Sequence, residues 1–373
     1  MNLKCQRNRL YIENDRYKGY YFIMNEFTVK NKRIGGNNPI FIVAEMSSNH
    51  LGDFDRAVKI IKAAALAGAD AIKLQTFKPD TITINSNKKY FQINNGSIWD
   101  GRTLYNLYEE AYTPWEWQPK LKNIAEEEGL ICFSTPFDKG AVDFLEEVLD
   151  PPIYKIASYE ITDIPLIEYI AEKKKPVILS NGIATLSDLE LALDTIKHKG
   201  NKKIGILKCV SSYPAAIEEY NLKTITNLAE TFDVITGLSD HTIGTTVPIL
   251  AVAFGAKIIE KHFTLDRASG GLDALFSLEP TEFAQMVKAV REAEKAVGNV
   301  TYELTEKQKK SRELGRSLFA AVDIKAGSKF TEENIKSVRP AYGLHPKYYK
   351  HIIGKKAKKD IEKGEPLEWN QIT

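Results

Sequence analysis

Short apolar runs alternate with amphipathic segments from about residue 40 to residue 298, and no other feature constrains the fold as strongly. The intervening segments, such as 55–69 and 280–298, carry apolar residues three and four positions apart, as helices packed on one face do. Strands that are apolar throughout are typical of parallel sheets covered on both faces. Eight such runs occur, namely FIVAE (41–45), AIKLQ (71–75), LICFS (130–134), IYKIAS (153–158), PVILS (176–180), IGILKCV (204–210), DVITGLS (233–239) and AKIIEKHF (256–263).

Eight strand–helix units over about 250 residues match a closed (β/α)8 barrel better than an open doubly wound sheet. No glycine-rich nucleotide-binding motif follows any of the runs, which argues against the open nucleotide-binding folds. We therefore predict a TIM barrel over 39–298, a charged linker over 299–312 and a small β-rich domain over 313–373. Residues 1–38 are expected to be an N-terminal extension that can form a β-hairpin, and Met24 is a second candidate start.

One connection of the predicted barrel is much longer than the others. The second and third runs start at residues 71 and 130, whereas most other runs start less than half as far apart. The extra residues are aromatic and punctuated by glycine. Long loops in compact domains usually serve function, and the loop after a barrel strand lies over the active-site mouth. We expect this insert to border the active site.

Overall composition excludes several classes of protein. The formal net charge is only +2, so binding to nucleic acid through bulk charge is not expected. No apolar run approaches the roughly 18–20 residues of a membrane-spanning helix. The three cysteines, Cys5, Cys132 and Cys209, are too few and too scattered for a disulfide framework or a four-cysteine zinc site. We expect reduced thiols and a cytoplasmic protein without nucleic-acid or membrane partners.

Polar residues gather where the predicted strands end. Catalytic groups of TIM barrels lie at the carboxyl ends of the strands, and burying charge there costs several kcal/mol unless the charge is paired. The pattern therefore predicts one shared polar cavity. Its candidates are Glu45, Asn49, His50, Lys73, Gln75, Ser134, Thr135, Lys155, Ser158, Glu160, Ser180, Asn181, Lys208, Ser211, Ser239, Asp240, His241, Lys261 and His262.

His241 and His262 end two neighbouring predicted strands. Adjacent strands lie about 4.8 Å apart, so both imidazoles can reach one divalent ion. Two protein ligands would leave the other positions to water and substrate, as a catalytic metal requires. The spacing alone leaves a structural, hydrogen-bonding role for these histidines equally open.

Four lysines lie inside predicted strands, where lysine is disfavoured: Lys73, Lys155, Lys208 and Lys261. Those that point inward would form an anion site with the neighbouring hydroxyls, while others can point outward into the helix layer. A Schiff-base aldolase using one activated lysine is the mechanistic alternative.

Two carboxylates complete the candidate site. Glu45 is the candidate acid–base group, with a structural role beside a lysine as the alternative. Asp273 can read a sugar hydroxyl or belong to a turn beside two glycines.

The motifs, taken in order, resemble the sialic acid synthase family. They are VAEMSSNHLGDFDRA, AIKLQTF, FSTPFD, YKIASYEITDIPLI, ILSNGIA, KCVSSYPA, GLSDHTIG and IEKHFTLDRASGGLD. The segments DIKAGSKFTEENIKSVRP and GKKAKKDIEKGEPL resemble the antifreeze-like (SAF) domain of the same enzymes. Within the family, WDGRTLYNLYEEAYTPWEWQ and RPAYGLHPKYY are more similar to pseudaminic acid synthases than to N-acetylneuraminate synthases.

The resemblance implies a condensation of phosphoenolpyruvate with 2,4-diacetamido-2,4,6-trideoxy-L-altrose, giving pseudaminate and phosphate. It implies a divalent metal, Mn2+, Mg2+ or Co2+, at His241 and His262. It also implies a homodimer with exchanged C-terminal domains, in which Arg339 reaches the partner's barrel. Phosphoenolpyruvate contacts carry over to Lys73, Thr135, Lys155, Ser180, Ser211 and Ser239, and sugar contacts carry over to Glu45, Gln75, Tyr213 and Asp273.

The chain departs from the sialate enzymes at two positions. Ser211 stands where they carry Asn, and Asn181 stands where they carry Thr. Both substitutions keep a polar group, so phosphate binding is expected to persist. Two other functions stay open at this point: another nonulosonate synthase, for N-acetylneuraminate or legionaminate, and a non-catalytic carbohydrate-binding protein suggested by the C-terminal domain alone.

Overall fold

The computed structural model describes residues 2–6, 9–14, 17–22, 25–94 and 96–373. The chain divides into two compact units, Met1–Gly298 and Asn299–Thr373. Within the described residues, no helix is both long and apolar enough to span a bilayer.

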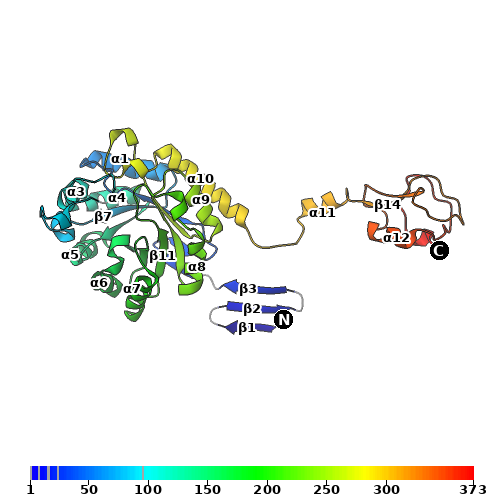
Figure 1. The fold of residues 1–373 in the computed structure, drawn as a ribbon, viewed down its shortest axis with the longest axis horizontal. Helices are drawn as coiled ribbons and strands as arrows, with labels where there is room; N and C mark the ends of the chain where they lie inside the picture. Colours follow the sequence, from blue (N-terminus) through cyan, green and yellow to red (C-terminus); the bar gives the residue numbers. More distant parts are fainter. Residues whose placement is uncertain (1, 7–8, 15–16, 23–24, 95) are drawn as a thin grey trace. The chain divides into compact units, whose positions relative to one another are not determined.

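The first unit contains a closed barrel of eight parallel strands, which confirms the predicted fold (Figure 1). The strands follow chain order around the barrel, and the last pairs with the first through the register His262↔Glu45. Each predicted apolar run supplies one strand. The strands are β6 (Phe41–Glu45), β7 (Ala71–Thr76), β8 (Ile131–Pro136), β9 (Tyr154–Ile156), β10 (Val177–Ser180), β11 (Ile204–Cys209), β12 (Ile235–Asp240) and β13 (Ile258–His262).

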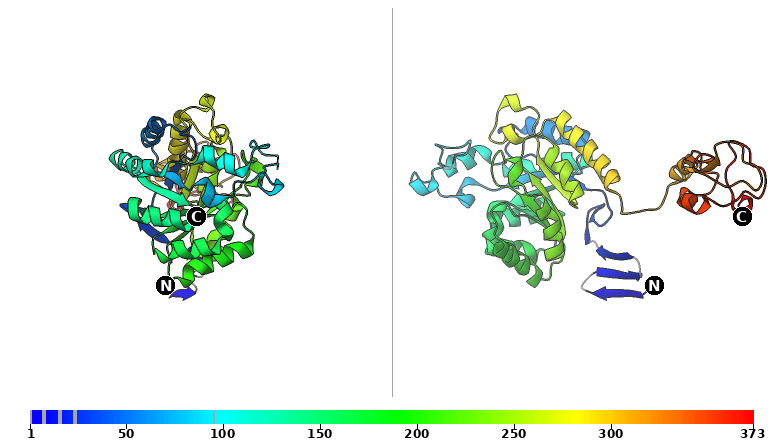
Figure 2. Two further views of the ribbon diagram at one scale, coloured as in Figure 1. Left: turned by 90° about the vertical axis from the view of Figure 1, so that its left-hand side faces the viewer. Right: turned by 45° about the vertical axis from the view of Figure 1, so that its right-hand side comes forward.

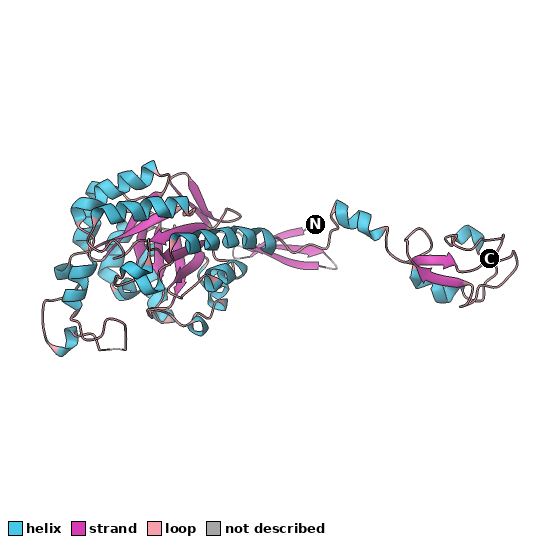
Figure 3. Cartoon of the chain, turned by 90° about the horizontal axis from the view of Figure 1, so that it is seen from above, coloured by secondary structure: helices cyan, strands magenta, loops and turns pink. Residues whose placement is uncertain are grey.

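Helices surround the strands, as the views in Figures 2 and 3 show. Their starts follow local rules: Asp53 accepts hydrogen bonds from the first backbone N–H groups of α1, and Thr185 and Asp188 form a capping box at α7. The helices of this unit are α1 (Phe54–Leu66), α2 (Pro79–Ile82), α3 (Leu104–Ala111), α4 (Gln118–Glu127), α5 (Lys139–Phe144), α6 (Ile164–Glu172), α7 (Leu186–His198), α8 (Lys223–Phe232), α9 (Thr246–Ala253) and α10 (Pro280–Val297).

Two small antiparallel sheets precede the barrel. Strands β1 (Asn2–Gln6), β2 (Arg9–Asn14) and β3 (Tyr17–Phe22) form one, and β4 (Glu26–Val29) pairs with β5 (Lys32–Gly35) in a hairpin. Phe27, Val29 and Ile34 of the hairpin are buried in one cluster with the barrel's inward apolar residues. The hairpin therefore closes the end of the barrel where the strands begin.

The barrel interior has two layers, because inward positions recur at every second residue of a strand. Near the strand starts these positions are apolar and belong to the cluster of the hairpin, namely Phe41, Val43, Ala71, Ile131, Phe133, Ile153, Ile178, Leu207, Ile235 and Ile258. Near the strand ends the same inward series becomes polar, and this polar layer holds the candidate site.

The second unit has its own small core, which includes Leu318, Phe330, Ile335 and Leu367. It contains α11 (Glu306–Arg312), the antiparallel pair β14 (Ser317–Ala320) and β15 (Ile335–Val338), and α12 (Tyr349–Ile352). Ile324 and Ile361 exchange backbone hydrogen bonds, and Asp323 and Asp360 each accept a bond from the backbone of the other's loop. The two loops DIKAG and DIEKG are thus held face to face.

Candidate active site

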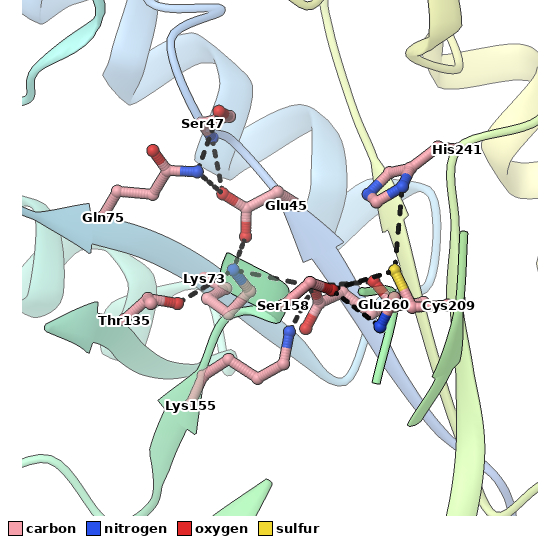
Figure 4. Close-up of polar contacts among 12 residues, drawn as sticks. Glu45, Ser47, Lys73, Gln75, Thr135, Lys155, Ser158, Cys209, His241 and Glu260 are labelled. Atoms are coloured by element: carbon pink, nitrogen blue, oxygen red, sulfur yellow. Dashed lines mark hydrogen bonds and ion pairs between the residues drawn. The ribbon is translucent and has the colours of Figure 1, made fainter. Parts of the chain in front are cut away.

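The polar layer brings most of the predicted site residues to the carboxyl ends of the barrel strands (Figure 4). All of its members continue the inward series of their strands. They are Glu45 of β6, Lys73 and Gln75 of β7, Thr135 of β8, Lys155 of β9, Ser180 of β10, Cys209 of β11, Ser239 of β12, and Glu260 and His262 of β13. Most are buried, and Gln75 is half-buried.

Four charged side chains form a buried network in this layer. Lys73 forms an ion pair with Glu45, and its Nζ lies 3.6 Å from Oε1 of Glu260. The same Glu260 oxygen accepts a 3.0 Å hydrogen bond from Nζ of Lys155. Lys73 also donates to the Thr135 hydroxyl at 3.2 Å. Two ammonium groups and two carboxylates therefore balance one another out of contact with water, as Figure 4 shows.

The network changes the proton affinity of its members. Burial raises the pKa of Glu45 to about 7, although Lys73 opposes the change. Burial also raises the pKa of Glu260, but Lys155 and Lys73 outweigh it and hold the pKa below its usual value. Glu260 is thus ionised between two lysines, while Glu45 can exchange a proton near neutral pH.

A second set of hydrogen bonds joins Glu45 to the neighbouring loops. Gln75 donates to Oε1 of Glu45 at 3.2 Å and to the Ser47 hydroxyl at 3.0 Å. Ser47 donates to Asp273, to which Ser48 also donates at 3.2 Å. Asp273 therefore belongs to the same polar network as Glu45 and does not serve only as a turn residue.

His241 and His262 meet at the ends of β12 and β13, with ring centroids 5.3 Å apart. Nδ1 of His241 lies 2.8 Å from the Val210 carbonyl, which can only accept, so this nitrogen carries a proton. Burial lowers the pKa of His241, but Cys209 and the Val210 carbonyl outweigh it and raise the pKa above its ordinary value, so Nε2 can ligate once the ring has given up its second proton. Nδ1 of His262 is buried and has no hydrogen-bond partner among the described residues. Burial lowers the pKa of His262 well below its ordinary value, and the facing His241 ring and the nearby lysines lower it further. The His262 imidazole is therefore neutral and able to ligate.

The histidine pair fits a divalent cation held by few protein ligands. Within the described part of the chain, no group of three or more His, Cys, Asp or Glu side chains has metal-binding geometry. Asp273 lies nearby, with its Oδ2 3.9 Å from Nδ1 of His262. Two imidazoles would leave most positions of a bound cation to water and substrate, as the sequence predicts.

Unpartnered hydroxyls border the lysines on the other side. The Oγ atoms of Ser180 and Ser211 are buried and lack hydrogen-bond partners in the part of the chain that the structure describes. A Cβ at Gly182 would collide with the hydroxyls of Ser211 and Ser158, so only glycine fits between them. Ser158 accepts from the Gly182 backbone N–H at 3.2 Å. Ser158 itself donates to Sγ of Cys209 at 3.4 Å. The hydroxyls of Ser180 and Ser211 are thus left as donors for a ligand, a suitable lining for an oxyanion.

Three other predicted site residues lie outside the inward series of the strands. Tyr213 stacks on His241 with ring centroids 4.5 Å apart. Glu160 lies in the turn after β9, where burial raises its pKa to about 7 and its Oε2 has no hydrogen-bond partner. Arg339 lies at the end of β15 in the second unit, where it is exposed.

Sequence reasoning missed three members of the site, Glu260, Cys209 and Ser47. Glu260 was detectable, because it stands two residues before His262 on the same strand and must share its inward face. The structure places Lys261 on the opposite face, where it pairs with Asp240 at 2.6 Å. Lys208 is half-buried and donates to the Cys209 carbonyl. Neither lysine joins the buried network.

Comparison with known proteins agrees with this geometry. Residues 60–302 match the NeuB family and residues 315–373 match the SAF domain, which confirms the predicted C-terminal domain. A pseudaminic acid synthase of Campylobacter jejuni is 51% identical over 329 residues, which are 88% of this chain and 95% of that protein. The Helicobacter pylori enzyme of the same name is 44% identical over 335 residues, with 90% and 98% covered.

Solved structures give the same result. The sialic acid synthetase of Leptospira borgpetersenii, crystallised with citrate, superposes with a TM-score of 0.70 at 36% identity, over 77% of this chain and 95% of that one. These comparisons agree with the resemblance drawn from the motifs. The barrel, the C-terminal domain, the share of each chain that is covered and the sequence identity all point to the same family. The chain belongs to the NeuB family, with pseudaminic acid synthases among its near relatives.

Proposed function

We propose that this protein is a pseudaminic acid synthase. It condenses phosphoenolpyruvate with 2,4-diacetamido-2,4,6-trideoxy-L-altrose to give pseudaminate and phosphate. The single observation that carries the proposal is the buried polar layer, which places two lysines, unpartnered hydroxyls, a protonatable glutamate and two facing imidazoles at one mouth. The 51% identity to a pseudaminic acid synthase supports this choice of acceptor.

Phosphoenolpyruvate is assigned to the lysine side of the cavity. Its phosphate and carboxylate need several cationic and hydroxyl donors, and this side offers them. The acceptors that compete for these donors include the two glutamates and Sγ of Cys209. Ser239 donates only a long 3.4 Å bond to Glu260 and is free to turn toward a ligand. The proposed contacts are Lys73, Thr135, Lys155, Ser158, Ser180, Ser211 and Ser239, with Glu160 at the edge.

The acceptor sugar is assigned to the side of Glu45, Gln75, Tyr213 and Asp273. These residues offer two carboxylate acceptors, one amide and one aromatic face, which is the usual mixture for a sugar with hydroxyl and acetamido groups. The shared network through Ser47 fixes the orientation of Gln75 and Asp273 before the sugar arrives. Preformed hydrogen-bonding groups lower the entropy cost of binding.

A divalent cation at His241 and His262 would act as a Lewis acid on the acceptor's aldehyde oxygen. Mn2+, Mg2+ and Co2+ are all suitable. The unpartnered Nδ1 of His262 and, in the neutral form of the ring, Nε2 of His241 are the nitrogen donors such an ion needs.

The chain's own residues then carry the remaining chemistry. The lysines and hydroxyls hold phosphoenolpyruvate so that its C3 attacks the aldehyde carbon. The aldehyde oxygen becomes an alkoxide that takes up a proton, and C2 is left electron-poor. Water adds at C2 and loses one proton, and the resulting hydroxyl loses its proton to form the C2 carbonyl as the C2–O bond to phosphate breaks and inorganic phosphate leaves. Glu45, with its pKa raised to about 7, can take the proton of that water or exchange one with the sugar.

The test measures phosphate release from phosphoenolpyruvate with a panel of acceptors. We expect turnover with the diacetamido-trideoxy-altrose, with loss of phosphate strictly dependent on the sugar. Preference for N-acetylmannosamine or for the legionaminate precursor would instead assign another nonulosonate synthase. Absence of turnover with every acceptor would leave only the carbohydrate-binding alternative. Borohydride trapping of a covalent adduct on Lys73 or Lys155 would replace this mechanism with a Schiff base.

A homodimer with exchanged SAF domains is part of the proposal. The loops at the barrel mouth expose large apolar side chains that a monomer would leave in water, namely Leu51, Tyr159, Ile183, Leu186, Ile217, Ile243 and Leu275. The second unit also exposes Tyr342 and Trp369. We assign the partner's SAF domain as the cover of this mouth, with Arg339 supplying a cation to the bound anionic complex. The reaction is assigned to the cytoplasm, where the cysteines stay reduced.

Subunit complementation tests the exchange. Chains carrying Arg339→Ala are co-refolded with chains carrying His241→Ala, and we expect partial recovery of activity, because one site of each heterodimer has both intact residues. Lys336→Ala, an exposed residue of the same strand, is the matched control and should be active by itself. Heterodimers that form without any recovery would contradict the exchange.

A further inference from the structure

One side chain of the insert between β7 and β8, Trp99, lies beside the aromatic residues of the candidate site. Its indole ring packs on Tyr213 with ring centroids 5.4 Å apart, and its Nε1–H donates to the Leu272 carbonyl at 3.3 Å. Tyr213 in turn stacks on His241. A residue far from the barrel strands in sequence therefore lies one ring away from the proposed metal ligands.

The position of Trp99 is set by the fold of its own loop. The Gly101 N–H donates to the Ile93 carbonyl across the loop at 2.9 Å, and the Ile93 N–H donates to the Arg102 carbonyl at 2.9 Å. Thr103 then caps the first turn of α3, which is labelled in Figure 1. The loop is closed at its base and anchored to a helix, so it can present Trp99 at a defined place.

Trp99 joins the three loops that carry the proposed acceptor contacts. The insert follows Gln75 at the end of β7, Tyr213 lies in the loop after β11, and Leu272 directly precedes Asp273 in the loop after β13. The polar contacts of the acceptor are therefore bordered by an aromatic wall, which Phe276 continues by packing on Tyr213 at 5.3 Å and on His262 at 4.9 Å.

We propose that Trp99 is a specificity-determining residue, whose ring packs against the apolar substituents at the end of the acceptor sugar remote from its aldehyde. This inference rests on the proposed function. The proposed acceptor carries a second acetamido group and a terminal methyl, whereas an ordinary N-acetylhexosamine carries hydroxyls there. The neighbouring Ile98 exposes 47% of its surface, which adds to the apolar character of the loop. The ring of Trp99 favours the former substituents, and because its N–H already donates to Leu272 it offers no hydrogen bond to the latter.

The test compares Trp99→Ala with wild type on two acceptors, the diacetamido-trideoxy-altrose and N-acetylmannosamine. We expect Trp99→Ala to raise KM for the first acceptor about tenfold. The KM for phosphoenolpyruvate should stay within about twofold, and kcat/KM for the second acceptor should not fall. The preference between the acceptors would then shrink. An equal loss on both acceptors, or no change on either, would overturn the inference.

Trp99→Phe separates the wall from an anchoring role, because it keeps an aromatic face and removes the N–H donated to Leu272. We expect it to retain most of the selectivity. A loss of selectivity as large as that of Trp99→Ala would mean that Trp99 acts only through its N–H, which anchors the loop of Leu272. Trp115→Phe is the matched control, since Trp115 is in the same insert, donates to the Phe77 carbonyl at 3.1 Å and packs on Phe144.

Two further readouts keep the outcomes distinct. Thermal melting of each variant shows whether a loss of activity reflects unfolding, and Trp99→Phe remains informative if Trp99→Ala does not fold. Wild-type protein that releases phosphate with neither acceptor would refute the proposed function itself. Wild-type activity with unchanged selectivity in both variants would refute only the role of Trp99.

Discussion

The two layers of the barrel interior are built by the same eight strands, yet they have opposite character. The layer at the strand starts is apolar and sealed by the β4–β5 hairpin. The layer two residues further along holds four buried charges and buried hydroxyls without partners. Because each unpartnered buried polar group costs about 1–3 kcal/mol, the second layer lowers the stability that the first provides. The fold is stabilised at one end so that the other end can bind ligands.

The largest loss of activity is expected when a histidine of the polar layer is replaced. We expect His262→Ala to lower kcat by about a thousandfold, because it removes a proposed ligand of the divalent cation. Stability should change little, since Nδ1 of His262 has no partner to lose. Phosphate release and thermal melting are measured side by side, and excess EDTA on the wild type should reproduce the loss. Full activity in EDTA would contradict the metal.

Lys73→Met should rank next. It removes a proposed phosphoenolpyruvate contact and also leaves Glu45 beside Glu260 without the cation between them. We expect kcat/KM for phosphoenolpyruvate to fall about a hundredfold. Glu45 can respond by taking up a proton, so the stability loss should be smaller than for an unpaired buried charge. Lys261→Met, which alters a buried ion pair on the opposite face, distinguishes a binding role from general destabilisation.

Ile34→Ala acts on the apolar layer and should lower stability without changing catalysis. The side chain is fully buried beneath the barrel, so its truncation should lower the free energy of unfolding by about 2–5 kcal/mol. Steady-state kinetics at a temperature where the variant is folded should give unchanged kcat and KM. A large loss of activity in folded protein would show that the two layers are coupled more closely than their separation suggests.

Ser180→Ala should have the smallest effect and the most distinctive one. Its hydroxyl is buried without a partner, so removal should leave the melting temperature unchanged or slightly higher. The KM for phosphoenolpyruvate should rise about tenfold while the KM for the sugar stays constant. If melting falls and KM does not move, the hydroxyl has a structural partner and the anion site lies elsewhere.

The sequence predicted the barrel strands and their polar carboxyl ends more accurately than it predicted the side-chain contacts. All eight apolar runs became barrel strands, because short runs that are apolar throughout and lie between amphipathic segments have few other ways to bury their surface. Lys73 and Lys155 were expected among the inward polar residues and lie there, but Glu260 between them was not foreseen. The neighbouring Lys261 drew attention instead, although alternation sends it to the opposite face.

What the sequence determined by itself was the barrel, the carboxyl-end location of the polar residues and the family, since each depends on local periodicity or on motifs in order. Tertiary structure alone decided which of these residues meet. Lys155 and Glu260 are 105 positions apart and share a hydrogen bond only because the barrel closes. Trp99 contacts Tyr213 only because a long insert folds back over the mouth. Side-chain contacts across a closed barrel depend on strand register and loop path, which local patterns do not encode.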